Sequence, residues 1–138
     1  MLANLAISTL SSNFPNVVSY WQEHHFVICP IPLHSSRLLW RGFNQSQLLS
    51  SALVCALHLG HCPEILVRTR ASRPQSTLPS DSSLRAGNIQ NSFVVTPPIP
   101  SSVILFDDVS TTGSTLLSAA QAFPPQTRLW GLVLASKA

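Results

Sequence analysis

Two adjacent acidic residues, Asp107 and Asp108, directly follow an uninterrupted apolar run, residues 103–106. Continuous apolar runs are typical of parallel strands that are buried on both faces, and open α/β sheets bind ligands at the carboxyl ends of such strands. Carboxylates accept hydrogen bonds, and the 2′- and 3′-hydroxyls of a ribose donate them. The two acids are therefore candidate catalytic residues for a sugar-containing ligand or a metal ion.

A segment rich in small hydroxyl residues comes next: Ser110, Thr111, Thr112, Gly113, Ser114 and Thr115. The hydroxyl groups are hydrogen-bond donors, and Gly113 lets backbone N–H groups approach an anion closely. The apolar run after it predicts a helix, whose positive dipole end favours phosphate. An ordinary strand–helix turn with a Ser or Thr N-cap is the alternative, but a cap explains only one of these residues.

The elements that position these groups alternate between strand and helix, which predicts an α/β fold with a central, mostly parallel sheet of about five strands flanked by helices. Residues 1–24 are expected to form a helical lead-in, broken at residues 11–16. The predicted helices cover residues 1–10, 44–59 and 114–123, with Gly60 as a helix stop. The predicted strands cover residues 26–29, 64–68, 92–95, 103–106 and 129–134.

The arginines fall into two groups near expected loops, Arg37 with Arg41, and Arg68, Arg70 and Arg73 with Arg85. The guanidinium fork suits phosphate oxygens, so these groups favour a small polyanion. The formal net charge is only +3 and charged residues make up 9% of the chain. Without a dense Lys/Arg run, non-specific DNA binding is expected to be weak.

The acid and hydroxyl segment at residues 103–115 resembles the phosphoribosyl pyrophosphate (PRPP) signature of the type I phosphoribosyltransferases. Further segments resemble the ComF/GntX (competence protein F-like) branch of that fold: residues 29–34, 41–45, the series from Arg68 to Asn88, and Phe93. The resemblance covers residues from about 26 to 134. It implies a type I phosphoribosyltransferase-like fold.

The resemblance also implies displacement of pyrophosphate from the ribose of PRPP, with Mg²⁺ as cofactor. Asp107 and Asp108 would hold the ribose hydroxyls, and the metal indirectly through those hydroxyls or water. Residues 110–115 would hold the 5′-phosphate. The pyrophosphate-binding residues would be His34, Arg37, Arg41, Arg68 and Arg70.

Several of these assignments have structural alternatives. Residues 41–45 also fit a helix entry, with Gly42 in the turn, Phe43 in the core and Asn44 as N-cap. For His34, the alternative is an exposed loop histidine. Residues 69–91 are expected to form a mobile loop or hairpin that closes over PRPP, and it contains Gln75, Arg85 and Asn88. Arg85 and Asn88 would alternatively hold that hairpin together.

The chain length predicts a single domain over residues 1–138. No apolar run is long enough for a membrane span, and no basic leader segment is visible, so a cytoplasmic location is expected. The three cysteines contain no Cys-x-x-Cys pair, so the zinc module of many ComF-like proteins is expected to be missing. Cys55 is expected on the apolar face of a helix.

Three classes of function follow: a phosphoribosyltransferase with an unknown acceptor, a PRPP- or nucleotide-binding module without turnover, and an accessory protein of DNA uptake or processing. DNA or DNA-processing proteins are possible partners, as is a second copy in a homodimer.

Overall fold

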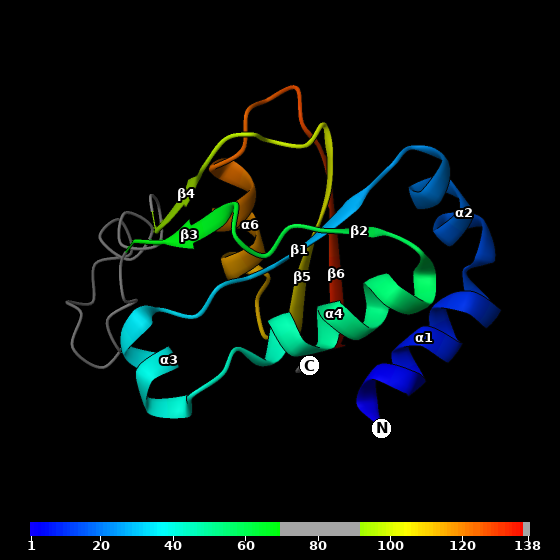
Figure 1. Cartoon of the computed structure of the whole chain (residues 1–138), viewed down its shortest axis with the longest axis horizontal. Helices are drawn as coiled ribbons and strands as arrows, with labels where there is room; N and C mark the ends of the chain where they lie inside the picture. Colours follow the sequence, from blue (N-terminus) through cyan, green and yellow to red (C-terminus); the bar gives the residue numbers. More distant parts are fainter. Residues whose placement is uncertain (70–91, 137–138) are drawn as a thin grey trace.

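A computed structural model describes residues 1–69 and 92–136 of the chain. Its centre is a four-stranded sheet in the order β2-β1-β5-β6, in which every neighbouring pair is parallel (Figure 1). The strands are β1 (Val27–Pro30), β2 (Gly60–His61), β5 (Ser102–Ser110) and β6 (Arg128–Ser136). The longest pairing joins β5 to β6, and β1 pairs only with the first part of β5.

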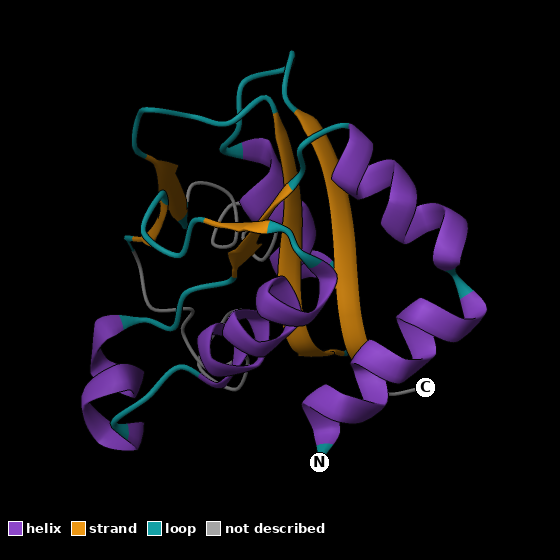
Figure 2. Cartoon of the chain, turned by 45° about the vertical axis from the view of Figure 1, so that its right-hand side comes forward, coloured by secondary structure: helices purple, strands orange, loops and turns teal. Residues whose placement is uncertain are grey.

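Helices cover both faces of this sheet, as Figure 2 shows. One face is covered by α1 (Leu2–Asn13), α2 (Pro15–Glu23) and α4 (Gln45–Leu57). The other face is covered by α6 (Ser114–Gln121) and by an antiparallel pair, β3 (Leu66–Arg68) with β4 (Phe93–Val95).

The period of two along β5 builds both layers of the core. Ile104 and Phe106 are buried against the α1/α2/α4 layer, whereas Val103 and Leu105 are buried against α6 and the β3–β4 pair. Alternate side chains of a strand point to opposite faces, so an unbroken apolar run is what a strand between two layers requires. The predicted α/β fold class is confirmed, and the architecture is that of a type I phosphoribosyltransferase-like sheet.

Several predicted boundaries were wrong. The parallel sheet has four strands among the described residues, because the segment around Arg68 pairs antiparallel with β4 outside it. The short strand β2 was not predicted. Residues 11–16 do not form a long break, since α1 continues to Asn13 and Pro15 opens α2. The helix α4 ends at His58 in a left-handed conformation, two residues before the expected stop at Gly60.

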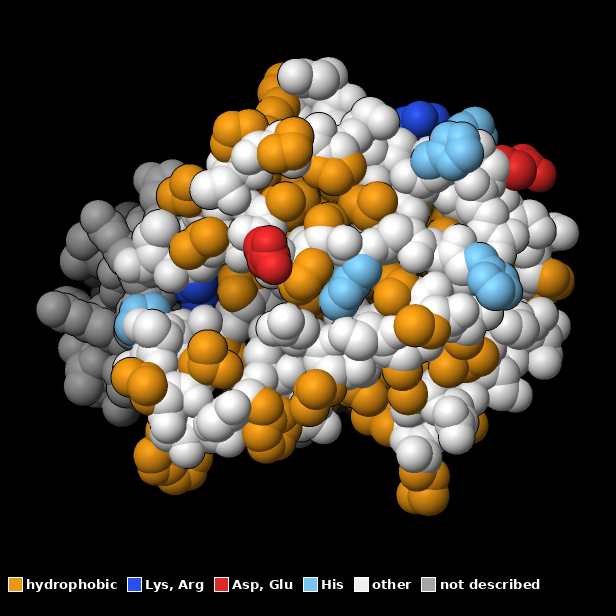
Figure 3. All heavy atoms as spheres, in the orientation of Figure 1, with side chains coloured by type: hydrophobic (Ala, Val, Ile, Leu, Met, Phe, Trp, Pro, Cys, Tyr) orange, Lys and Arg blue, Asp and Glu red, His pale blue; other side chains and the backbone are white. Residues whose placement is uncertain are grey.

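The largest unexpected element is α3 (Ser35–Arg41), which replaces part of an expected loop. No residue of α3 is buried, and Leu39 and Trp40 are each 87% exposed. Phe43, expected in the core, is 50% exposed. Hydrophobic side chains gather over this helix at the lower left of Figure 3. Cys55 also lies at the surface, because the buried face of α4 runs through Ser46, Ser50, Leu53, Val54 and Leu57.

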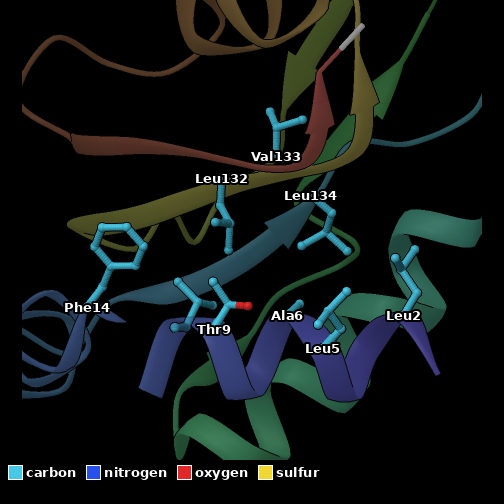
Figure 4. A pocket seen from close by; sticks show the side chains of 9 residues that line it. Leu2, Leu5, Ala6, Thr9, Phe14, Leu132, Val133 and Leu134 are labelled. Carbon is cyan, nitrogen blue, oxygen red and sulfur yellow. The ribbon is translucent and has the colours of Figure 1, made fainter. Parts of the chain in front are cut away.

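A cavity of about 240 Å³ lies between α1 and β6 (Figure 4). Nine residues line it: Leu2, Leu5, Ala6, Thr9, Leu10, Phe14, Leu132, Val133 and Leu134. All but Thr9 are apolar, so this cavity has no charged group with which to do acid–base or phosphate chemistry. No helix in the described part of the chain is long and apolar enough to cross a membrane.

Candidate functional site

The site begins where β1 stops and β5 continues. Pro30 is the last residue of β1 and pairs with Phe106, and the next N–H, that of Ile31, donates to the Phe106 carbonyl at 2.8 Å. The strand β5 runs on to Ser110, supported on its other side by β6. Asp107 and Asp108 therefore lie within a strand, and not after its end as predicted, but beyond the carboxyl end of β1. The edge of β5 that faced β1 is left open beside them.

Ser46, in the first turn of α4, fills this open edge. The Asp108 N–H donates to the Ser46 Oγ at 3.3 Å, where a continued β1 would have supplied a backbone acceptor. The same Oγ lies 3.3 Å from an oxygen of Asp107 and 3.1 Å from an oxygen of Asp108. A hydroxyl has one proton, so it donates to one carboxylate at a time. Ser46 is 3% exposed and holds the two acids together.

Asn44 places α4 at this position. Its Oδ1 accepts from the Ser46 N–H at 3.2 Å, which confirms the predicted N-cap, and its Nδ2 donates to the Ile31 carbonyl at 3.0 Å. One side chain thus joins the start of α4 to the chain leaving β1. Gly42, at φ +78°, ends α3 in a left-handed turn, which confirms the helix-entry interpretation of this segment apart from the exposed Phe43.

The acids open into a polar cavity of about 240 Å³. It is lined by the segment after β1, the residues around α3, the start of α4, β3, β5 and the start of α6. We call it the polar pocket and define it by these residues: Ile31, Pro32, Leu33, Arg37, Arg41, Asn44, Gln45, Ser46, Arg68, Asp107, Asp108, Val109 and Thr115. Residues separated by more than sixty positions meet here, and three predicted arginines share the pocket with both predicted acids.

The charges of the polar pocket are not neutralised by contact. No ion pair within 4.0 Å joins its arginines to its acids in the described part of the chain. Burial lowers the pKa of Arg68 and the positive charge of Arg37 lowers it further, whereas the negative charge of Asp107 raises it. The Arg68 guanidinium lies 5.3 Å from the centre of the Phe93 ring, and its buried Nε has no hydrogen-bond partner among the described residues. The pocket therefore holds cationic donors that an anionic ligand would satisfy.

The proton affinity of Asp107 is raised by its surroundings. Burial raises its pKa from the ordinary 3.8 to about 6, and the neighbouring Asp108 contributes further to the rise. The hydrogen bond from Ser46 acts in the opposite direction. Two like charges held side by side in a half-buried site disfavour the ionised form of one of them. Near neutral pH, Asp107 is consequently poised to exchange a proton or to gain from a nearby cation.

The hydroxyl-rich segment forms a tight turn at the start of α6. The Gly113 N–H donates to the Ser110 Oγ at 3.0 Å, and the Ser114 N–H donates to the Thr112 Oγ1 at 3.4 Å. Gly113 has φ +73°, a left-handed conformation that favours glycine. Only Thr115 of the six predicted phosphate-binding residues lines the polar pocket. The first turn of any helix has N–H groups without intrahelical acceptors, and here they belong to residues beside the pocket.

The remaining predicted site residues have other positions. His34 does not line the polar pocket; its Nδ1 caps α3 by accepting from the Ser36 N–H at 3.2 Å. Arg70, Gln75, Arg85 and Asn88 lie outside the described residues, so their assignments stay predictions. The sequence did not predict the role of Ser46 or the second contact of Asn44. Both depend on where β1 ends and not on a local sequence pattern.

The acids fit a magnesium ion that shares its ligands with a phosphate compound. Among the described residues, no group of three or more His, Cys, Asp or Glu residues converges, so this part of the chain offers no closed cage for a metal. Mg²⁺ is usually held by one or two carboxylates, waters and substrate phosphates. Asp107 and Asp108 beside a cationic pocket match that donor set.

Comparison with known proteins gives no matching family model. Among curated proteins, the chain is 40% identical over 95 residues to the DNA utilization protein YhgH of Escherichia coli K12, which is 68% of this chain and 41% of that protein. It is 35% identical over 121 residues to the competence protein ComFC of Bacillus subtilis, which is 87% of this chain and 46% of that protein. It is 34% identical over 116 residues to competence protein F of Haemophilus influenzae, covering 78% of this chain and 50% of the relative.

The chain thus spans about half the length, or less, of the curated relatives that it matches. Identity of this level across most of the chain confirms the resemblance found in its motifs. The chain belongs to the ComF-like family.

Proposed function

We propose that the polar pocket binds PRPP or a related phosphoribosyl ligand together with Mg²⁺. The observation that carries the proposal is the meeting of Arg37, Arg41 and Arg68 with Asp107 and Asp108 in one cavity of about 240 Å³. Cations and acids that do not pair with each other suit a ligand with separate phosphate and hydroxyl groups.

The arginines are the proposed pyrophosphate-binding groups. Arg37 and Arg41 stand one helical turn apart on α3, so their side chains share a face of the helix. Arg68 approaches from β3 with a buried Nε that lacks a partner among the described residues. A pyrophosphate oxygen would satisfy this donor and would relieve the repulsion between Arg37 and Arg68.

Asp107 and Asp108 would accept hydrogen bonds from the 2′- and 3′-hydroxyls of the ribose, with Ser46 fixing both carboxylates. The same two acids would hold Mg²⁺ through those hydroxyls or through water, and the metal would neutralise charge on the pyrophosphate. Thr115 and the N–H groups at the start of α6 would hold the 5′-phosphate, aided by the helix dipole.

The reaction that this arrangement serves is displacement of pyrophosphate from the anomeric carbon by a nucleophile. The arginines would stabilise negative charge on the departing group, because they line the pocket that it leaves. Asp107, with a pKa of about 6, would accept a proton from the nucleophile near neutral pH. The proposal does not specify the acceptor. A binding module without turnover would bind the same ligand but would not carry out this displacement.

Isothermal titration of the chain with PRPP and Mg²⁺ tests the proposal. We expect saturable, magnesium-dependent binding, reduced at least tenfold in the double variant Asp107→Asn/Asp108→Asn. Glu23→Gln, which removes an exposed carboxylate on α2, is the matched control and should bind normally. Absence of binding by the folded wild type, or unchanged binding by the double variant, would reject the site.

Release of pyrophosphate separates an enzyme from a binding module. Incubation with PRPP, Mg²⁺ and a panel of nitrogenous bases and amines should release pyrophosphate for at least one acceptor if the chain is a transferase. Binding without release for any acceptor supports the binding module.

A role in DNA uptake or processing is the second candidate, favoured by the names of the relatives: one is a DNA utilization protein and two are competence proteins. The relatives are longer than this chain, so such a role would belong to the whole protein. Anisotropy with labelled single- and double-stranded DNA at several salt concentrations tests it. The net charge of +3 predicts weak binding by this chain that salt abolishes.

A further inference from the structure

Two of the three cysteines are neighbours in the parallel sheet. Ile28 of β1 pairs with His61 of β2, so Cys29 and Cys62 occupy the next position of the same register. The Cys62 N–H donates to the Ile28 carbonyl at 3.0 Å, which continues the pairing by one residue. Cys29 belongs to the core cluster on the α6 face and Cys62 packs against that cluster, so both sulfur atoms point to the same side of the sheet.

The two thiols differ in access and in acidity. Cys29 is completely buried, whereas Cys62 is half-buried at the edge of the sheet. The Cys29 Sγ lies 4.0 Å from the Pro30 carbonyl, and the Cys62 Sγ lies 3.6 Å from the Ile28 carbonyl. The interaction between the two thiols lowers the pKa of Cys62 and raises that of Cys29. Cys62 is thus the thiol that a reagent in solvent reaches, and it is also the thiol that more readily forms a thiolate. Cys29 lies behind it.

We propose that Cys29 and Cys62 form a redox modification site, which small disulfides such as glutathione disulfide convert into an intrachain disulfide. The Cys62 thiolate attacks the small disulfide, forming a mixed disulfide and releasing one small thiolate. Cys29, after losing its proton, attacks the Cys62 sulfur and releases the second small thiolate. The two protons of the cysteines end on the two released thiols, and the protein loses two electrons to the small disulfide.

The geometry allows this bond at the cost of a small movement. Neighbouring parallel strands lie about 4.8 Å apart, within the range of Cα separations that disulfides span, but the Cβ atoms must come closer. The strand that must move is β2, which is two residues long and forms the edge of the sheet. A strained disulfide is more easily reduced again, which is the behaviour of a reversible modification.

The modification would act next to the polar pocket. Cys29 precedes Pro30, and the following Ile31 and Pro32 line that pocket. The Ile31 carbonyl also accepts the hydrogen bond from Asn44 that seats α4. The redox proposal itself does not depend on what the pocket binds.

The test treats the Cys55→Ser variant, which lacks the exposed cysteine of α4, with glutathione disulfide. We expect loss of both remaining thiols, a mass lower by two hydrogens, no retained glutathione, and full reversal by a reductant. Peptide mapping should join Cys29 to Cys62. Adding Cys29→Ala should instead trap glutathione on Cys62, and adding Cys62→Ser should leave Cys29 unmodified under native conditions.

A folded Cys55→Ser variant that keeps both thiols, or that retains glutathione on Cys62, would overturn the proposal. Disulfides found only between two chains would overturn it as well. These readouts use no phosphoribosyl ligand, so their failure and the failure of the proposed function are separate results.

Discussion

At the scale of single residues, the acidic pair depends on a serine for its arrangement. Asp107 and Asp108 lie side by side on a half-buried stretch of β5, where their charges repel. The Ser46 Oγ contacts both carboxylates and also accepts the Asp108 N–H. Ser46 should therefore set both the orientation and the proton affinity of the acids.

Replacing Ser46 with Ala should raise the pKa of Asp107 above about 6, because the hydrogen bond from Ser46 lowers it. It should also cost about 1–2 kcal/mol of unfolding free energy, since the Asp108 N–H and the carboxylates lose a partner. Carbon-detected NMR titration of the carboxyl groups measures the first effect and urea unfolding the second.

Ser51→Ala is the matched control on the same helix, because the exposed Ser51 hydroxyl bonds only to the Gln47 carbonyl. It should leave the pKa of Asp107 unchanged. Equal pKa values of Asp107 in Ser46→Ala and the wild type would show that Ser46 does not tune the acid.

Asp107 should make the unliganded protein less stable as the pH rises. Its pKa in the folded protein, about 6, lies above the ordinary 3.8, so the folded state holds the proton more tightly than the unfolded chain. The resulting stabilisation is complete below about pH 3.8 and is lost as the pH rises to about 6.

Asp107→Asn should consequently melt a few degrees above the wild type at pH 7.5, and this difference should shrink toward pH 4. Scanning calorimetry across this range measures the difference, and Glu64→Gln, an exposed carboxylate, should show no such trend. A difference in melting temperature that is the same at every pH would contradict the account.

At the scale of elements, the site comes from a mismatch in strand length. The strand β1 ends at Pro30 while β5 extends to Ser110, and the start of α4 fills the step. The turn between β5 and α6 then depends on Gly113, which adopts φ +73° and would present a side chain to open space. The demand on this glycine is therefore conformational and not steric.

Gly113→Ala should lose about 1 kcal/mol of unfolding free energy, because an L-residue at this φ is strained. Gly113→Asn should lose less, since asparagine tolerates the left-handed conformation. Gly131→Ala is a suitable control: its Cβ would meet the nearest atom, Leu116 Cδ1, at an ordinary 3.6 Å. Urea unfolding compares the three variants, and an equal loss for both alanine variants would argue against backbone strain at Gly113.

The sequence predicted the elements that carry strong local patterns. The apolar run before Asp107 predicted a buried strand, and Asn44 predicted the start of α4. It did not predict α3. Leu39 and Trp40 are exposed, so this helix has no buried face that would space its apolar residues at a helical period. Nor did the sequence predict Ser46, because a serine acquires its role only when β1 ends and β5 continues.

At the scale of the whole molecule, two cavities of similar size differ sharply in the side chains that line them. The cavity between α1 and β6 is lined almost entirely by apolar residues, and the polar pocket contains three arginines and two acids. Of these two cavities, only the polar pocket offers charged side chains to a phosphate group. The chain covers about half the length of its relatives. The activity of those longer proteins is therefore a question about the whole protein and not about the polar pocket alone.

The location of the ligand is the most direct test of this account. A ¹H–¹⁵N NMR titration with PRPP and Mg²⁺, including the arginine Nε signals, should shift Arg37, Arg41 and Arg68 together with Ser46, Asp108 and Gly113. Residues of the α1–β6 cavity should not respond. Shifts confined to that apolar cavity, or a spectrum of the folded protein that PRPP leaves unchanged, would contradict the proposed site.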